Sequence, residues 1–147
     1  MTEIQNAAAL IDLFGHWPDF HDGEIHAMRL DITDHREPSL EIAFEVAEMS
    51  NEIDDRGFYR VRARARTVIR FERVVNLRLE GIYLQNCIGE LTIAQTAPED
   101  FDEVLGGGHP HSRRRHRVDW SASVGMTGSF LCDDITVLSV EPSVRAS

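Results

Sequence analysis

The stretch YRVRARARTVIRF, which runs from Tyr59 to Phe71, decides the fold of this chain. Apolar and basic side chains alternate along it, and a two-residue period places successive side chains on opposite faces of a β-strand. We therefore predict a long strand with one face in a core and the other covered by guanidinium groups. The apolar face holds Tyr59, Val61, Ala63, Ala65, Ile69 and Phe71, and the basic face holds Arg60, Arg62, Arg64, Arg66 and Arg70.

Weaker alternation on both sides of this stretch predicts a sheet around it. Strands are expected at 28–33, 40–47, 74–80, 90–94, 117–124 and 135–140, with a turn at 34–38. An N-terminal helix is expected to begin at a capping box formed by Thr2 and Gln5 and to end at Gly15. Pro98 opens an acidic segment of one or two helical turns that Gly106 would close. The expected fold is α+β, with the helix packed on a mainly antiparallel sheet curled into a sandwich or partial barrel. The apolar face of the expected helix consists of Ile4, Ala7, Ala8, Ile11 and Phe14.

Length and composition place the chain among ordinary globular proteins. Its 147 residues, of which 42% are hydrophobic, suit a single domain spanning residues 1–147. Cys87 and Cys132 form no C-x-x-C pair, which argues against a zinc knuckle and against a disulfide scaffold. The N-terminus lacks the pattern of a signal peptide, and no apolar run is long enough to span a membrane. We therefore expect a cytoplasmic protein without a membrane partner, and its oligomeric state is left open.

The charge of the chain is strongly acidic and unevenly distributed. There are 25 acidic and 15 basic side chains, all of the basic ones arginine, and the net charge is −10. Residues 56–78 hold eight of the arginines. Nucleic-acid binders gain most of their affinity by neutralising phosphates, so this charge argues against a nucleic-acid partner for the whole domain. It favours association with a basic protein.

The arginine face of the 59–71 strand admits two interpretations. It would suit an RNA-binding module, which is one alternative function. It would equally suit a solvated sheet surface on which the arginines lie beside Glu41 and Glu45 of the preceding strand as cross-strand charge pairs. We favour the second interpretation, because no aromatic side chains alternate with the arginines to stack on bases.

The densest group of chemically active side chains lies between the helix and the first strand, at residues 16–26. His21, Asp22 and Glu24, together with His26, carry the alternative hypothesis of a small metal-dependent enzyme. The second ligand group that such a site needs is hard to find, because His109, His111 and His116 lie in an expected loop.

We favour a structural role for this segment. Trp17 and Phe20 would cover the end of the core, Pro18 would stop the helix, and His21 or Asp22 would bond open backbone groups. No nucleophile elbow or phosphate-binding loop is found elsewhere, so we predict no catalytic residue, no metal and no cofactor.

The segment WPDFHDGEI, residues 17–25, resembles the signature of a bacterial family called Immunity protein 50. The signature residues are Trp17, Pro18, Phe20, His21, Asp22 and Glu24. Four later segments resemble further blocks of that family and occur in the same order: FERVVNLRLEG (71–81), QN (85–86), GSFLC (128–132) and VLSVEP (137–142). The resemblance spans residues 14–142 and implies a non-enzymatic protein that binds and neutralises a cognate toxin of a bacterial polymorphic-toxin system.

An acidic inhibitor can associate rapidly with a basic toxin, such as a nuclease, and cover its substrate groove with carboxylates. We therefore expect two acidic toxin-binding groups, one in the loop after the second strand and one at the acidic helical segment. The first consists of Glu48, Glu52, Asp54 and Asp55, and the second of Glu99, Asp100, Asp102 and Glu103.

Overall fold

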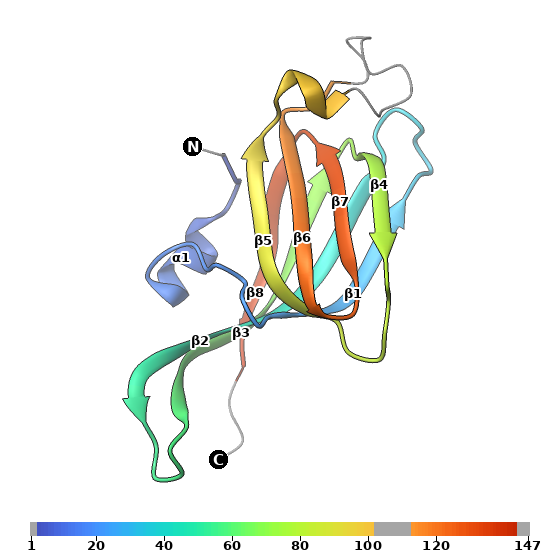
Figure 1. Cartoon of the computed structure of the whole chain (residues 1–147). Helices are drawn as coiled ribbons and strands as arrows, with labels where there is room; N and C mark the ends of the chain where they lie inside the picture. Colours follow the sequence, from blue (N-terminus) through green and yellow to red (C-terminus); the bar gives the residue numbers. More distant parts are fainter. Residues whose placement is uncertain (1–2, 102–112, 144–147) are drawn as a thin grey trace.

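The chain forms one antiparallel β-sheet of eight strands with a short N-terminal helix, as shown by a computed structural model that describes residues 3–101 and 113–143 (Figure 1). The strand order is β4-β7-β6-β5-β1-β2-β3-β8. This confirms the prediction of a helix with a mainly antiparallel sheet. The elements are α1 (Ala8–Phe14), β1 (Glu24–Asp31), β2 (Ser39–Ile53), β3 (Tyr59–Glu72), β4 (Val75–Glu80), β5 (Cys87–Gln95), the 3₁₀ turn η1 (Pro98–Phe101), β6 (His116–Val124), β7 (Thr127–Cys132) and β8 (Ile135–Pro142).

The sheet is open, with β4 and β8 at its two edges, and it is neither closed nor strongly curled. The predicted curling into a sandwich or partial barrel is therefore wrong. Closure would require β4 and β8 to pair, and these two strands lie at opposite ends of the strand order. At the centre of the sheet, β1 and β5 pair only at Glu24 and Cys87. Next to this pair the registers shift on both sides, so that His26 is an extra residue in β1 and Gly89 an extra residue in β5. Such bulges bend a strand and end its pairing.

Apolar side chains from both halves of the sheet nevertheless share one core. Phe71 on β3 contacts Phe130 on β7 edge to face, with ring centroids 4.9 Å apart. Trp120 on β6 also packs against Phe130, and its indole N–H donates to the carbonyl of Met126 at 2.9 Å. The prediction from alternation is confirmed for Ala65, Ile69 and Phe71, which are fully buried, whereas Tyr59 of the predicted core face is exposed.

The helix begins later than predicted. The N–H of Gln5 donates to the carbonyl of Ile135 at 2.8 Å, so this residue forms a bridge to β8 instead of a capping box. Thr2 lies outside the described residues. Leu10 and Phe14 are the buried residues of α1, whereas Ile11 of the predicted apolar face is exposed. Gly15 ends the helix in the left-handed conformation, with φ of 84°, as predicted.

Several strand boundaries also differ from the predictions. β1 begins at Glu24, four residues before the expected strand, and β2 continues to Ile53. β7 was not predicted from alternation, because Thr-Gly-Ser offers little apolar signal. The 3₁₀ turn at Pro98–Phe101 agrees with the predicted helical turn, whereas Gly106, His109 and His111 lie outside the described residues.

The two longest strands extend beyond the sheet as a hairpin. β1 pairs with β2 only as far as Glu45, and β8 pairs with β3 only as far as Ala65. We call residues 49–61, which lie beyond both limits, the arm; Figure 1 shows it projecting at the lower left. At its tip the Asp54 carboxylate accepts the N–H groups of Arg56 and Phe58 at 2.9 and 3.0 Å, which fixes the turn.

Candidate functional site

The segment 17–25 joins α1 to the centre of the sheet. Phe20 and Asp22 adopt left-handed conformations, with φ of 63° and 62°. The N–H of Asp22 donates to the carbonyl of Ile88 at 2.9 Å, and the N–H of Ile88 donates to the carbonyl of Gly23 at 2.8 Å. A Cβ on Gly23 would lie 2.9 Å from the carbonyl oxygen of Phe20, so this close passage requires glycine. These contacts fix the place where β1 and β5 meet.

The apolar members of the segment continue this joint into the core. The ring of Phe20 is fully buried and lies 5.1 Å from that of Phe44 on β2. Trp17 packs on Phe20 at 5.7 Å, and Pro18 is buried between them. The segment thus anchors α1 over one end of the core.

The polar members form a hydrogen-bonded cluster at the same junction. Both oxygens of the Glu24 carboxylate are occupied: Gln85 Nε2 donates to Oε1 at 2.7 Å, and His26 Nε2 lies 3.0 Å from Oε2. These two bonds lower the pKa of Glu24. His21 Nδ1 lies 2.7 Å from the carbonyl oxygen of Gly89, and this bond, helped by the nearby Asp22 carboxylate, raises the pKa of His21.

The positions of His21, Asp22, Glu24 and His26 can be compared with the hypothesis that they bind a metal ion. Over residues 3–101 and 113–143, no three His, Cys, Asp or Glu side chains converge in a way that could hold a metal ion. His21 directs one ring nitrogen to β5, and Glu24 holds Gln85 and His26. The cluster therefore joins the segment before β1 to β5, and β1 to the loop before β5.

The two thiols are poorly suited to act as nucleophiles. Burial and the Glu24 carboxylate raise the pKa of Cys87. Burial raises the pKa of Cys132 to about 12. Both side chains are therefore protonated at neutral pH, whereas thiol catalysis requires the thiolate.

The arginine face is balanced by carboxylates. Arg70 Nη2 donates to Glu41 Oε1 at 3.1 Å, and Arg66 lies between Glu45 and Glu141 in the register of β2, β3 and β8. The expected cross-strand pairing with Glu41 is therefore confirmed. Arg62 does not lie on the predicted basic face. It is an extra residue in β3, a bulge beside Glu48 of β2, and the bulge interrupts the alternation of side chains. Its guanidinium donates to the carbonyl of Phe14 at the end of α1 and to Glu48 at 2.6 Å.

The first acidic group lies on β2 and at the tip of the arm. Glu48 is not in a loop, as expected, but within β2, where it contacts Arg62 and lies 3.1 Å from His16 Nε2. Glu52 is also in β2 and is exposed, and Asp54 and Asp55 occupy the turn. The structure therefore brings Glu52, Asp54 and Asp55 together and separates Glu48 from them.

The described members of the second acidic group, Glu99 and Asp100, lie on η1 at the opposite end of the molecule from the arm (Figure 1). Glu99 is exposed on η1, whereas Asp100 accepts from Arg117 Nη1 at 3.0 Å and from the N–H of Ala97 at 2.7 Å. Asp102 and Glu103 lie outside the described residues. Among the described residues, Glu99 and Asp100 therefore do not share a continuous surface with Glu52, Asp54 and Asp55.

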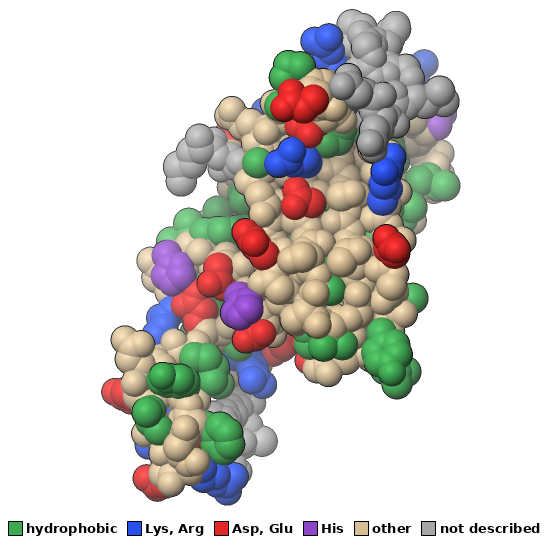
Figure 2. All heavy atoms as spheres, in the orientation of Figure 1, with side chains coloured by type: hydrophobic (Ala, Val, Ile, Leu, Met, Phe, Trp, Pro, Cys, Tyr) green, Lys and Arg blue, Asp and Glu red, His purple; other side chains and the backbone are tan. Residues whose placement is uncertain are grey.

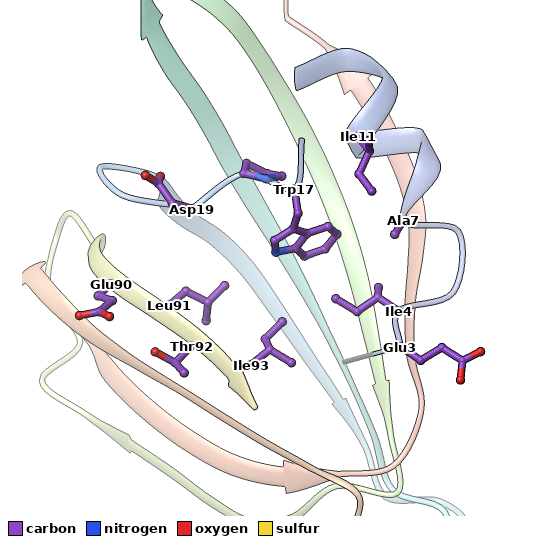
Figure 3. Close-up of a pocket in the computed structure, with 11 residues that line it drawn as sticks. Glu3, Ile4, Ala7, Ile11, Trp17, Asp19, Glu90, Leu91, Thr92 and Ile93 are labelled. Carbon is purple, nitrogen blue, oxygen red and sulfur yellow. The ribbon is translucent and has the colours of Figure 1, made fainter. Parts of the chain in front are cut away.

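A groove of about 800 Å³ lies between α1 and β5 and was not predicted from the sequence. Figure 3 shows Trp17 at its wall, with Ile4 and Ile11 on one side and Leu91 and Ile93 on the other. The apolar pattern of the predicted helix indicated that Ile4 and Ile11 face the sheet. It gave no indication that part of this contact stays open.

Comparison with known protein families gives one result. The model of Immunity protein 50 matches residues 6–143. This chain belongs to the Immunity protein 50 family. No curated protein and no solved structure matches it.

Membership in the Immunity protein 50 family gives the general role of the chain. Immunity proteins of polymorphic-toxin systems neutralise a toxin and are generally non-enzymatic. In the part of the chain that the structure describes, no helix has the length and apolarity needed to cross a membrane. Membership in the Immunity protein 50 family implies one partner, a cognate toxin.

Proposed function

We propose that this protein neutralises a basic cognate toxin by binding it and covering its working surface. The observation that carries the proposal, once the family is known, is the net charge of −10. Charge of this size attracts a basic protein over long distances and raises the association rate. A nuclease fits this description, because its phosphate-binding groove is basic and carboxylates can occupy it in place of phosphates.

The exposed carboxylates of the arm are the first candidates for this contact. Glu52 and Asp55 have exposed side chains at the projecting end of the molecule. Asp54 holds the turn that presents them, and Glu99 supplies a carboxylate at the other end. Glu48 and Asp100 are already paired with arginines, so they have less charge to offer a partner. Asp102 and Glu103 remain candidates from the sequence alone.

The test is protection against the toxin domain encoded next to this gene. Cells that express that domain should survive when this chain is co-expressed, and the two purified proteins should form a complex whose association rate falls as salt is added. Loss of protection with a folded protein and no detectable complex would refute the proposal. A complex whose association rate is independent of salt would refute the electrostatic part of it.

Replacing Glu52 and Asp55 together by arginine should slow association several-fold, because both charges point toward solvent. Asp54 is left unchanged so that the turn is preserved. A matched control replaces Glu37 and Glu80, exposed carboxylates outside the arm, by arginine. If both double variants slow association equally, the effect comes from the net charge of the chain, and Glu52 and Asp55 are not part of the interface.

A further inference from the structure

The arm has one apolar face that the described part of the chain leaves uncovered. The register pairs Met49 with Val61 and Ile53 with Tyr59, so these side chains lie on one face of the hairpin. Met49, Ile53 and Tyr59 are 55%, 59% and 57% exposed, and Phe58 beside them is 68% exposed. Figure 2 shows apolar side chains at the surface of this projecting part.

Where the hairpin leaves the sheet, the opposite face is the covered one, because Val46 lies three residues before Met49 on β2 and so points to the other side. Val46 on β2 and Phe14 at the end of α1 are fully buried there. Arg62 and Glu48 tie the end of the helix to the base of the arm. In the part of the chain that the structure describes, no element covers Met49, Ile53 and Tyr59 on the other face.

An uncovered two-stranded hairpin with this composition is unusual. Such a hairpin is marginally stable in water without a third strand or a helix to cover its apolar face. Large exposed apolar patches with charged neighbours mark surfaces of protein association. The turn held by Asp54 presents these side chains in a defined shape, which lowers the entropic cost of binding.

We propose that the apolar face of the arm is the main contact with the toxin and inserts into an apolar cleft on it. This rests on the proposed function above. Met49, Ile53 and Tyr59 are the anchors, since aromatic and large aliphatic side chains in desolvated pockets supply most of the affinity of protein interfaces.

Charge favours a basic toxin over a second copy of this chain as the occupant. Two copies would each carry a net charge of −10 and would repel one another. A two-fold contact through the arms would also place the tip carboxylates Glu52 and Asp55 of both copies near each other. The arm residues 49–61 hold three acids and two arginines, so they are nearly neutral and suited to close apolar contact.

This division assigns two kinetic roles to different parts of the molecule. The field of the whole chain sets the association rate, and the apolar arm sets the dissociation rate. Substitutions of the apolar side chains of the arm should therefore change how long the complex lasts and leave the salt dependence of its formation unchanged, whereas Glu52 and Asp55 contribute to the field that sets the association rate.

The experiment compares two double variants by surface binding kinetics against the catalytically inactivated toxin domain encoded next to this gene. I53S/Y59S removes two anchors of the arm. I82S/L84S removes two side chains that are 78% and 93% exposed in the loop between β4 and β5, so it matches the loss of exposed apolar surface. We expect the arm variant to dissociate about 100-fold faster and the loop variant to behave as the wild type. Both should keep the wild-type midpoint of urea unfolding.

The outcomes separate this proposal from the proposed function. If the wild type binds the toxin domain and I53S/Y59S dissociates at the wild-type rate, the arm proposal is overturned while the function stands. If the wild type does not bind at all, the proposed function fails first. If sedimentation shows a wild-type dimer that I53S/Y59S dissociates without affecting toxin binding, the occupant is a second copy and the proposal is overturned. If the arm variant unfolds early, the single variant I53S takes its place, because Ile53 is the most exposed of the three anchors.

Discussion

Phe71 and Phe58 belong to the same hairpin and differ completely in their surroundings. In the body of the sheet Phe71 is fully buried against Phe130, whereas in the arm Phe58 is 68% exposed. Both regions have the apolar and charged pattern of a two-faced strand. They differ in their neighbours, since β1, β8 and α1 flank the body and all end before the arm. Alternation in a sequence therefore defines a face, and the tertiary neighbours decide whether that face becomes core or contact surface.

The sharpest test of this comparison exchanges one phenylalanine for alanine in each region. Phe71→Ala should lower the free energy of unfolding by about 3–5 kcal/mol, because it leaves a cavity against Phe130. Phe58→Ala should lower it by less than about 0.5 kcal/mol. Urea unfolding followed by tryptophan fluorescence measures both. Similar losses in the two variants would show that the arm is packed against the body in solution.

A glycine in each region gives the next largest effect. A Cβ on Gly128 would overlap the ring of Trp120 in the core, so Gly128→Ala should cost about 1–3 kcal/mol and alter the near-ultraviolet circular dichroism of the tryptophan. Gly57 at the turn of the arm has φ of 84° and open space around it. Gly57→Ala should cost only the backbone strain of about 1 kcal/mol and leave that spectrum unchanged. An altered spectrum in the Gly57 variant would contradict the separation of the two regions.

The boundary between body and arm can be tested at Arg62. Arg62→Ala removes the bonds to the Phe14 carbonyl and to Glu48, which join α1 to the base of the arm. We expect a loss of roughly 0.5–1 kcal/mol in unfolding free energy, because the guanidinium is partly exposed. Arg60→Ala, two residues farther along the arm, is the control and should be nearly neutral. Equal losses would mean that the bulge does not give Arg62 a distinct role.

The smallest expected effect is a pH dependence at the junction of β1 and β5. Bonds from Gln85 and His26 lower the pKa of Glu24 below the value of 4.5 expected for the unfolded chain. The stability from this group is therefore present above pH 4.5 and is lost as the pH falls through the lower folded pKa. Glu24→Gln should flatten the decline of unfolding free energy in this acid range, and I53S/Y59S should leave it unchanged. A Glu24→Gln protein with the wild-type acid profile would show that these bonds do not contribute.

Much of the body could be predicted from the sequence, because burial there follows local periodicity. The alternation at 59–71 identified β3 and its buried residues Ala65, Ile69 and Phe71. Periodicity predicted the structure less well where contacts between residues far apart in the sequence determine it. Gln5 was expected in a helix cap, yet it bonds to β8, far away in the sequence. The sheet was expected to curl, but closure depends on whether β4 and β8 pair, and local alternation does not report which distant strands pair.

The surface was harder to predict, since exposed carboxylates look alike in a sequence. Glu48 and Glu52 are four residues apart, but only Glu52 is exposed, because a bulge aims Arg62 at Glu48. The arm itself gave no local signal, because its strands continue those of the body. Its position became visible only where β1 and β8 stop pairing.

The hydrogen bonds of Gln5 and Asn6 to β8 affect the order in which the chain can fold during synthesis. The Asn6 side chain donates to the carbonyl of Val137 at 2.9 Å, and the Val137 N–H donates to the Gln5 carbonyl at the same distance. A ribosome adds about 5–20 residues per second, so the earliest residues wait roughly 7–26 s for their partner strand. A nascent chain halted before Ile135 leaves Leu10 and Phe14 without the strand that seals them. Packing of the N-terminal residues on the sheet therefore waits until β8 has been synthesised.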